Sequence, residues 1–202
     1  MTPPGFRLFP GRLGAASQRA LVDDVLRLAK DAPFYRPVTP GGKPMSVAMT
    51  GLGPLGWVTD ARGYRYQPGH PVTGRPWPPM PPTLLALWAE LCDPATPPDA
   101  CLVNRYDGEA RMGLHRDADE ADFAFPVLSI SLGDTALFRL GGVRRGDPTG
   151  QIRLASGDVC ILAGEARLAY HGVDRILAGS SRLVPGGGRI NLTLRRARPA
   201  EL

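Results

Sequence analysis

The feature that most restricts the fold of this chain is a succession of short, strand-like segments separated by glycine and proline. Among the 202 residues, 25 Gly and 22 Pro are scattered between apolar segments, so they indicate turns and not one disordered tract. The strands follow one another too closely for repeated β-α-β units, which favours antiparallel sheets. The expected strands are 45–50, 55–59, 101–106, 127–132, 136–140, 151–154, 158–162, 168–170 and 189–195.

Two segments have the apolar spacing of helices. Residues 18–30 carry apolar side chains at helical intervals after Ser17, a good N-cap residue. A second helix is expected to begin at Pro82 or Thr83 and to end before Asp93. We therefore expect a mainly β fold with flanking helices (α+β), in which a two-sheet roll has helices backing one sheet.

Composition narrows the class of protein. The odd number of cysteines, 3, without a CxxC pair, argues against a secreted disulfide framework. No apolar run approaches the roughly 20 residues that span a bilayer, and the N-terminus has no apolar signal region, so a cytoplasmic protein without a membrane partner is expected. The lack of a coiled-coil pattern favours a monomer. The net charge of +5 suits a polyanionic partner such as nucleic acid. The alternative is that the richness in Arg, Ala, Gly and Pro reflects coding bias and not a binding function.

A metal site is predicted from His115, Asp117 and His171. On an extended segment residues i and i+2 point to the same side, so His115 and Asp117 can reach one ion. The His-x-Asp triplet alone is weak, but His171, at the end of a later strand, supplies a second imidazole. Two histidines and one carboxylate leave open positions for a cosubstrate and O2, as in non-haem Fe(II) oxygenases, whereas structural zinc needs a fourth ligand. His70, in a loop rich in Pro and Gly, is expected to be exposed to solvent.

The segment 189–195 alternates polar and apolar residues, so Arg189, Asn191, Thr193 and Arg195 share one face of a strand. An exposed edge strand would give the same pattern. Two arginines about 20 Å apart along the backbone, leaning toward each other, leave a gap near the length of a five-carbon diacid, which favours 2-oxoglutarate as the cosubstrate. Asn104 and Tyr106 also share a face and could donate hydrogen bonds to its carboxylates.

At this point the sequence resembles the AlkB family of Fe(II)/2-oxoglutarate-dependent nucleic-acid dealkylases, and its bacterial members in particular. The resemblance runs from about Thr39 to Arg195 and is carried by several short stretches together. These are 39–42 (TPGG), 45–50 (MSVAMT), 55–57 (LGW), 76–78 (PWP), 104–106 (NRY), 115–117 (HRD), 170–172 (YHG) and 189–195 (RINLTLR).

The resemblance implies a double-stranded β-helix, or jelly roll, with iron at its mouth. A length of 202 residues suits one domain, 1–202, and the resemblance implies within it a helical and nucleotide-recognition lid region over about 1–100 and a catalytic core over about 101–202. It also implies that Arg189, Asn191 and Tyr106 hold one end of 2-oxoglutarate, and that Arg195 and Asn104 help at the other. For the damaged base it points to Trp57, Tyr64 and Tyr66 from the lid, with Asp119 and Arg145 nearby.

These substrate assignments have plainer alternatives. Aromatic residues are more often core residues, although stacking on Trp57, Tyr64 and Tyr66 would suit a base taken out of its helix. Asp119 could be a solvated member of the acidic run 117–120. One residue departs from the family pattern: Leu162 stands where relatives often carry tryptophan, which could alter pocket packing or O2 access.

The activity that the resemblance implies is oxidative demethylation of 1-methyladenine and 3-methylcytosine in single- or double-stranded DNA, with RNA as a second candidate. It would be coupled to 2-oxoglutarate decarboxylation and release formaldehyde, succinate and CO2. Two alternatives stay open. One is the same chemistry on tRNA, a protein or a small molecule, and the other is a nucleic-acid-binding module without catalysis.

Overall fold

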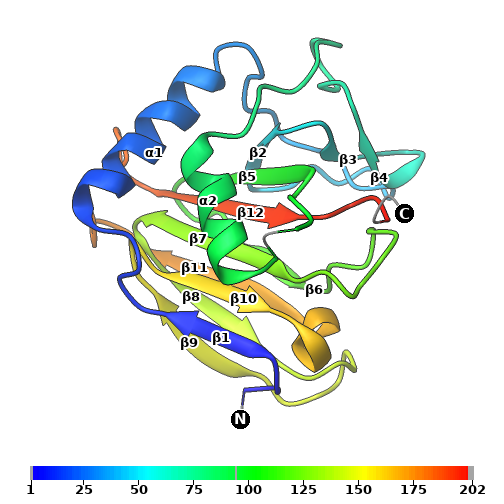
Figure 1. Ribbon diagram of the computed structural model, residues 1–202, viewed down its shortest axis with the longest axis vertical. Coiled ribbons are helices and arrows are strands. Elements are labelled where there is room, and N and C mark those ends of the chain that lie inside the picture. The colour runs from blue at the N-terminus through cyan, green and yellow to red at the C-terminus, as the bar shows by residue number, and fades with distance from the viewer. Residues whose placement is uncertain (1, 94, 200–202) are drawn as a thin grey trace.

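A large antiparallel sheet forms the centre of the fold. The computed structural model describes residues 2–93 and 95–199, and in it the six strands of this sheet stand in the order β1-β10-β7-β12-β5-β2 (Figure 1). The strands are β1 (Phe6–Phe9), β2 (Ala48–Leu52), β5 (Ala100–Tyr106), β7 (Val127–Gly133), β10 (Val159–Leu162) and β12 (Arg189–Arg195). Since β12 lies between β5 and β7, it is a central strand, and the exposed edge strand considered above is excluded.

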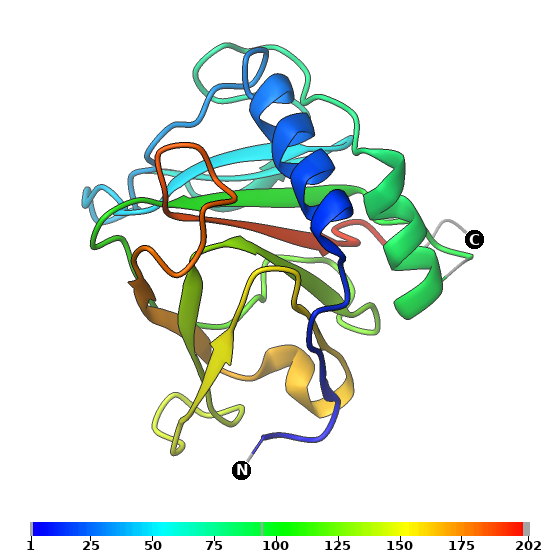
Figure 2. The ribbon, with the colours of Figure 1, turned by 90° about the vertical axis from the view of Figure 1, so that its left-hand side faces the viewer.

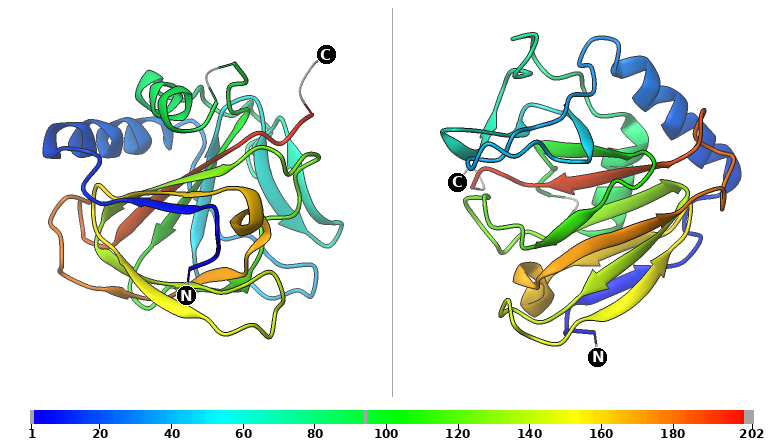
Figure 3. Two further views of the ribbon diagram at one scale, coloured as in Figure 1. Left: turned by 60° about the horizontal axis from the view of Figure 1, so that its bottom comes forward. Right: turned by 180° about the vertical axis from the view of Figure 1, so that it is seen from behind.

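A smaller sheet of four strands faces the large one, with the order β6-β11-β8-β9. Its strands are β6 (Met112–His115), β8 (Thr135–Leu140), β9 (Gly150–Leu154) and β11 (His171–Leu177), and the 3-10 helix η1 (Gly164–Leu168) leads into β11. A separate hairpin consists of β3 (Gly56–Asp60) and β4 (Gly63–Gln67). Seen from behind, the hairpin lies beside the end of β12 (Figure 3, right). Two facing antiparallel sheets make a jelly-roll core, as expected.

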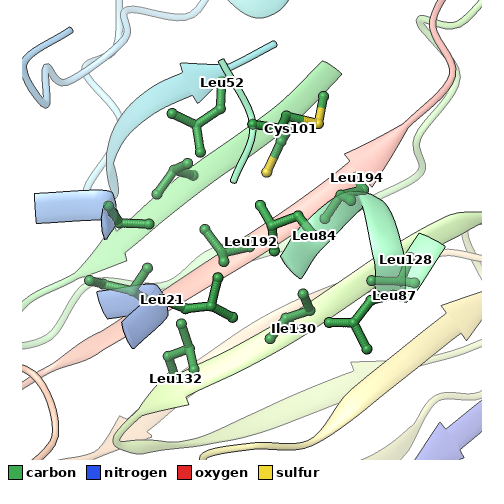
Figure 4. Packing of buried hydrophobic residues seen from close by; sticks show 14 of the residues in the cluster. Leu21, Leu52, Leu84, Leu87, Cys101, Leu128, Ile130, Leu132, Leu192 and Leu194 are labelled. Atoms are coloured by element: carbon green, nitrogen blue, oxygen red, sulfur yellow. The ribbon is translucent and has the colours of Figure 1, made fainter. Parts of the chain in front are cut away.

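Both α-helices cover the outer face of the large sheet (Figures 1 and 2). Helix α1 (Ala15–Leu28) buries a stripe of apolar side chains, and α2 (Pro82–Leu91) starts with a proline at a position where the missing N–H costs no hydrogen bond. Their apolar faces meet the outward-facing side chains of the sheet strands (Figure 4). This layer includes Leu21, Leu84, Trp88, Leu128, Ile130, Ile190, Leu192 and Leu194.

The opposite face of the large sheet points at the small sheet. The alternation of β12 therefore sends Ile190, Leu192 and Leu194 toward the helices and Arg189 and its polar partners toward the space between the sheets. A second apolar cluster fills part of that space. The polar row of β12 is thus buried inside the roll.

The chain crosses from the large to the small sheet at Gly133 and Asp134. Gly133 has φ +90°, and a Cβ there would lie 2.5 Å from the carbonyl oxygen of Gly188, so only glycine fits. The Asp134 carboxylate accepts hydrogen bonds from the backbone N–H groups of Gly179, Ser181 and Gly188. Because Gly133 pairs with Arg189, this turn fixes the start of β12.

Most of the sequence predictions agree with the structure, and the differences have physical causes. The strand predicted over 168–170 is wrong, because these residues end η1 and precede β11. Strands β1, β4, β6 and β11 were not predicted. The first three are short, and their apolar alternation is weak, whereas β11 begins only after the segment predicted over 168–170. Helix α1 begins earlier than predicted, with Gly14 at the N-cap and Ser17 inside the first turn. No helix of residues 2–93 and 95–199 is long and apolar enough to cross a membrane.

Candidate metal centre and cavity

His115, Asp117 and His171 converge between the two sheets. His115 ends β6 and His171 begins β11, and the two residues are paired directly across the ladder. One possible ligand atom from each of the three residues can be chosen so that all lie within 4.8 Å of one another. No other group of at least three His, Cys, Asp or Glu residues with this geometry occurs among the described residues. The predicted triad is therefore assembled by the fold.

Hydrogen bonds set which nitrogen of each imidazole is free. Nδ1 of His115 lies 2.9 Å from the carbonyl oxygen of Gly113, and Nδ1 of His171 lies 3.0 Å from that of Ala169. A carbonyl only accepts, so in both rings Nδ1 carries the hydrogen and Nε2 keeps its lone pair. Each Nε2 lies 3.8 Å from an oxygen of Asp117. The backbone thus orients both rings as metal ligands.

The charge states of the triad residues favour the binding of a cation. Burial alone would raise the pKa of Asp117, but the positive charge of Arg195, with smaller contributions from the adjacent His171 and His115 rings, holds it well below its usual range. Burial, with the neighbouring His115, lowers the pKa of His171 to about 4. A carboxylate and neutral imidazoles with open positions suit a divalent iron, whereas a closed zinc site would need a fourth ligand.

A cavity of about 350 Å³ adjoins the triad and contains the polar row of β12. Arg189, at its inner end, is 1% exposed, and its guanidinium donates from Nη2 to Ser131 and lies over the ring of Tyr106. Nε and Nη1 of Arg189 and Oδ1 of Asn104 have no hydrogen-bond partner among the described residues. Burial lowers the pKa of Arg189. A buried cation with free donors fits an anionic ligand such as a carboxylate of 2-oxoglutarate.

The other residues predicted for the cosubstrate lie along the same wall. Tyr106 pairs with Arg189 and Asn104 with Asn191, so Asn104 is level with the middle of β12 and not with Arg195. Asn191 donates to Ser129 and to the carbonyl of Ile130, and it accepts from Thr193. Arg195 lies next to the triad, where Nη2 donates to Asp117 over 2.7 Å.

The mouth of the cavity is formed by the β3–β4 hairpin and the loop after β6. Trp57 and Tyr64 stack with ring centroids 5.6 Å apart, and Tyr64 is half exposed. The indole N–H of Trp57 donates to Asp119 over 2.7 Å, and the hydroxyl of Tyr66 donates to Glu120 over 2.5 Å. All of these residues line the cavity. The three predicted aromatic residues and Asp119 therefore meet at one opening.

Three further residues singled out in the sequence, Arg145, Leu162 and His70, differ in their relation to the cavity. Arg145 is exposed in the β8–β9 loop and does not line the cavity. Leu162 does line it, in its apolar part. The expectation that His70 is solvated is wrong: it is 1% exposed, its Nε2 lies 2.8 Å from the carbonyl of Pro33, and its Nδ1 accepts from Val72 and Thr73, so it fastens the loop after β4.

The sequence reasoning also missed residues. Glu120 and Arg167 form a buried ion pair beside the triad, with Nη2 and Oε2 2.9 Å apart. Glu120 belongs to an acidic run that is typical of solvated loops, and Arg167 belongs to no pattern. Ser129 and Ser131 follow the alternation of β7, which could have placed them beside β12.

Comparison with known proteins agrees with this geometry. The family model of the 2OG-Fe(II) oxygenase superfamily matches residues 5–195. The chain is 71% identical over 197 residues to an alpha-ketoglutarate-dependent dioxygenase AlkB homolog of Caulobacter vibrioides, covering 98% of this chain and 90% of that protein. It is 45% identical over 181 residues to the alpha-ketoglutarate-dependent dioxygenase AlkB of Escherichia coli K12, covering 88% and 83%. The solved structure of OsALKBH1 matches with a TM-score of 0.85 at 30% identity, covering 97% and 98%.

Proposed function

The chain belongs to the AlkB family within the 2OG-Fe(II) oxygenase superfamily and is an Fe(II)/2-oxoglutarate-dependent dioxygenase, and on this premise we propose that it demethylates alkylated nucleic-acid bases. The proposed substrates are 1-methyladenine and 3-methylcytosine in DNA, with RNA as a second candidate. The observation that carries this proposal is the mouth of the cavity, where a stacked aromatic pair and a carboxylate stand beside the metal triad.

We assign the metal to His115, Asp117 and His171, and 2-oxoglutarate to the wall that β12 and β5 share. Arg189 offers free donors to one carboxylate, with Tyr106 paired to it across the strands. Asn191 and Asn104 pair with each other further along the wall, and Arg195 lies next to the triad. When bound, Fe(II) and 2-oxoglutarate activate O2 and oxidise the N-methyl group, with succinate and CO2 as co-products and formaldehyde as the form in which the methyl carbon leaves. The protein supplies the orientation of these groups and the exclusion of water.

The base is proposed to enter between the hairpin and the triad. Trp57 and Tyr64 present aromatic faces at the opening, and such faces receive a base that has left its stack. Methylation at N1 of adenine or N3 of cytosine leaves the ring positively charged, and Asp119 is a carboxylate on which a cationic ring can be held. In this structure Asp119 accepts the indole N–H of Trp57, so it already faces the opening.

The nucleic-acid backbone is proposed to follow basic side chains outside the cavity. Arg145 is exposed on the β8–β9 loop, where it could meet a phosphate without touching the base. Arg62 and Arg65 are less available, because both pair with Asp60 on the hairpin. The net charge of +5 favours such a partner.

Single- and double-stranded oligonucleotides with one 1-methyladenine or 3-methylcytosine test the proposal directly. We expect formaldehyde and succinate to form in equal amounts with these substrates, and the unmethylated oligonucleotides to yield no formaldehyde. His171→Ala should abolish both products. Succinate formation that no methylated nucleic acid stimulates would refute the substrate, and the same assay with methylated tRNA or proteins would then identify the alternative.

A further inference from the structure

Beside the metal triad lies a buried ion pair to which the proposed reaction assigns no role. The side chains of Arg167 and Glu120 are 2% and 1% exposed, and their Nη2 and Oε2 atoms are 2.9 Å apart. Removing two charges from water is costly, so a buried pair of this kind is weak evidence of a gain in stability. Its remaining contacts indicate what it does.

Arg167 holds both ends of the loop that follows the triad carboxylate. Its Nη1 donates to the backbone carbonyl of Asp117 over 2.7 Å, and its Nε donates to the carbonyl of Phe125 over 2.8 Å. Because the third nitrogen is taken by Glu120, the planar guanidinium fixes three points of residues 117–125 at once. The backbone of Asp117, and with it the triad carboxylate, is therefore positioned from η1.

Glu120 extends this connection to the hairpin. Its Oε2 accepts from Arg167, while its Oε1 accepts from the hydroxyl of Tyr66 over 2.5 Å and lies 3.2 Å from Nε of Arg195. Tyr66 pairs across the hairpin with Trp57. One buried carboxylate thus joins the triad loop, the last residue of β12 and the aromatic hairpin.

We propose that Glu120 and Arg167 are positioning residues that couple the metal triad to the β3–β4 hairpin, so that filling the triad stiffens the hairpin. The inference rests on the proposed function in one respect, namely that the hairpin receives the base. The coupling follows from a shared support: a ligand that fixes Asp117 and Arg195 also fixes Glu120, and Glu120 holds Tyr66. The contact between Trp57 and Asp119 is a second link, but it is exposed and therefore weaker.

Amide hydrogen exchange of residues 56–67 tests the coupling without nucleic acid. We expect Mn(II) with 2-oxoglutarate to slow exchange in the hairpin of the unmodified protein by about tenfold. In Tyr66→Phe, which loses only the hydroxyl that reaches Glu120, the slowing should fall below about threefold. Tyr64→Phe makes the same chemical change on the same hairpin but away from Glu120, and it should keep the full response.

Metal affinity tests the second half of the proposal. Arg167→Lys keeps the charge but loses the fork that holds Asp117, so its dissociation constant for Mn(II) should rise by about tenfold. Arg139→Lys, on the outer side of the small sheet, is the matched control and should bind Mn(II) as the unmodified protein does. A melting curve establishes that each variant is folded, and Tyr66→Phe carries the test if Arg167→Lys is not.

The inference is overturned if the hairpin of the unmodified protein does not respond to Mn(II) and 2-oxoglutarate, if Tyr66→Phe responds as strongly as Tyr64→Phe, or if folded Arg167→Lys binds Mn(II) normally. A protein that is inactive on methylated nucleic acid but shows the hairpin response would refute the proposed substrate and leave the coupling intact. The two proposals therefore fail separately.

Discussion

Arg195 donates a hydrogen bond to the triad carboxylate of Asp117 over 2.7 Å, and both side chains are buried. The negative ligand of the metal is thus neutralised by a residue of the central strand β12 before any cation binds. Arg195 in turn lies against two carboxylates: burial would lower its pKa, but the charges of Asp117 and Glu120 raise it above its ordinary value.

Arg195→Met should destabilise the metal-free protein far more than the metal-bound one. It leaves the buried carboxylate of Asp117 without its partner, which typically costs about 3–5 kcal/mol of unfolding free energy. A divalent ion would supply the missing positive charge. Chemical unfolding with EDTA and with Mn(II) measures both values. Arg153→Met, on an exposed position of β9, is the control, and an equal loss with and without the ion would contradict the prediction.

Arg189→Met should leave the stability of the metal-free protein intact but weaken the binding of 2-oxoglutarate. Arg189 is buried with two unpartnered donor nitrogens among the described residues, so replacing it with an apolar side chain should leave the metal-free protein as stable or raise its unfolding free energy by about 1 kcal/mol. Affinity for 2-oxoglutarate should fall by about a hundredfold, because a charge-assisted pair is lost. Calorimetric titration of the Mn(II) protein measures the affinity. Unchanged 2-oxoglutarate binding would remove Arg189 from the cosubstrate site.

Sequence patterns predicted structure best where the determining property lies within one strand or helix. The alternation of Arg189 to Arg195 gave the bounds of β12 and the shared face of its polar residues, because a period of two is a property of the local backbone. The triad was recognised because histidine is rare in this chain, which has 3, and two of them lie near Asp117 or at the end of a strand-like segment.

The remainder depended on contacts between distant segments. Arg167 reaches Glu120 across 47 positions of the chain, and no periodicity relates them. His70 looked exposed because proline and glycine surround it, yet its ring is enclosed between Tyr35 and Trp77. Strand β1 is short and gains its place only by pairing with β10 near the other end of the chain. Such features follow from tertiary packing, which local propensity does not contain.

Gly56→Ala should destabilise the hairpin through a steric clash. A Cβ at Gly56 would lie 2.3 Å from the indole ring of Trp77, whose Nε1 donates to the carbonyl of Gln67 in β4. Crowding of this kind costs about 1–3 kcal/mol, and urea unfolding measures it. Gly41→Ala adds the same methyl group where nothing lies within 4 Å, and it should unfold like the unmodified protein. Equal stability of the two variants would show that Trp77 moves freely aside.

Alkaline pH should destabilise the fold through its buried thiols. Burial raises the pKa of Cys101 from 9.0 to about 12 and that of Cys160 to about 11, so the folded protein keeps protons that the unfolded chain releases. The stabilisation is complete below pH 9 and is lost as the pH rises from 9 toward 11 or 12. At pH 10 each thiol should account for a loss of about 1 kcal/mol, measurable by urea unfolding at pH 8 and pH 10. Cys101→Ala should weaken this dependence, and an unchanged pH profile would contradict the assignment.

Arg145 and Asp119 should affect nucleic-acid binding in different ways. Arg145 is exposed on a loop outside the cavity, so Arg145→Ala should weaken the binding of methylated and unmethylated oligonucleotides equally. It should also reduce the slope of log affinity against log salt concentration by about 1. Asp119 lies at the mouth of the cavity. Asp119→Asn still accepts the hydrogen bond from the indole of Trp57, so it should weaken the binding only of oligonucleotides that carry a cationic base. Oligonucleotides with 3-methylcytosine and with the neutral 3-methylthymine separate the two effects in fluorescence anisotropy titrations at several salt concentrations. If Asp119→Asn weakened the binding of both lesion-containing oligonucleotides to the same extent, Asp119 would shape the opening and would not recognise the charge of the base.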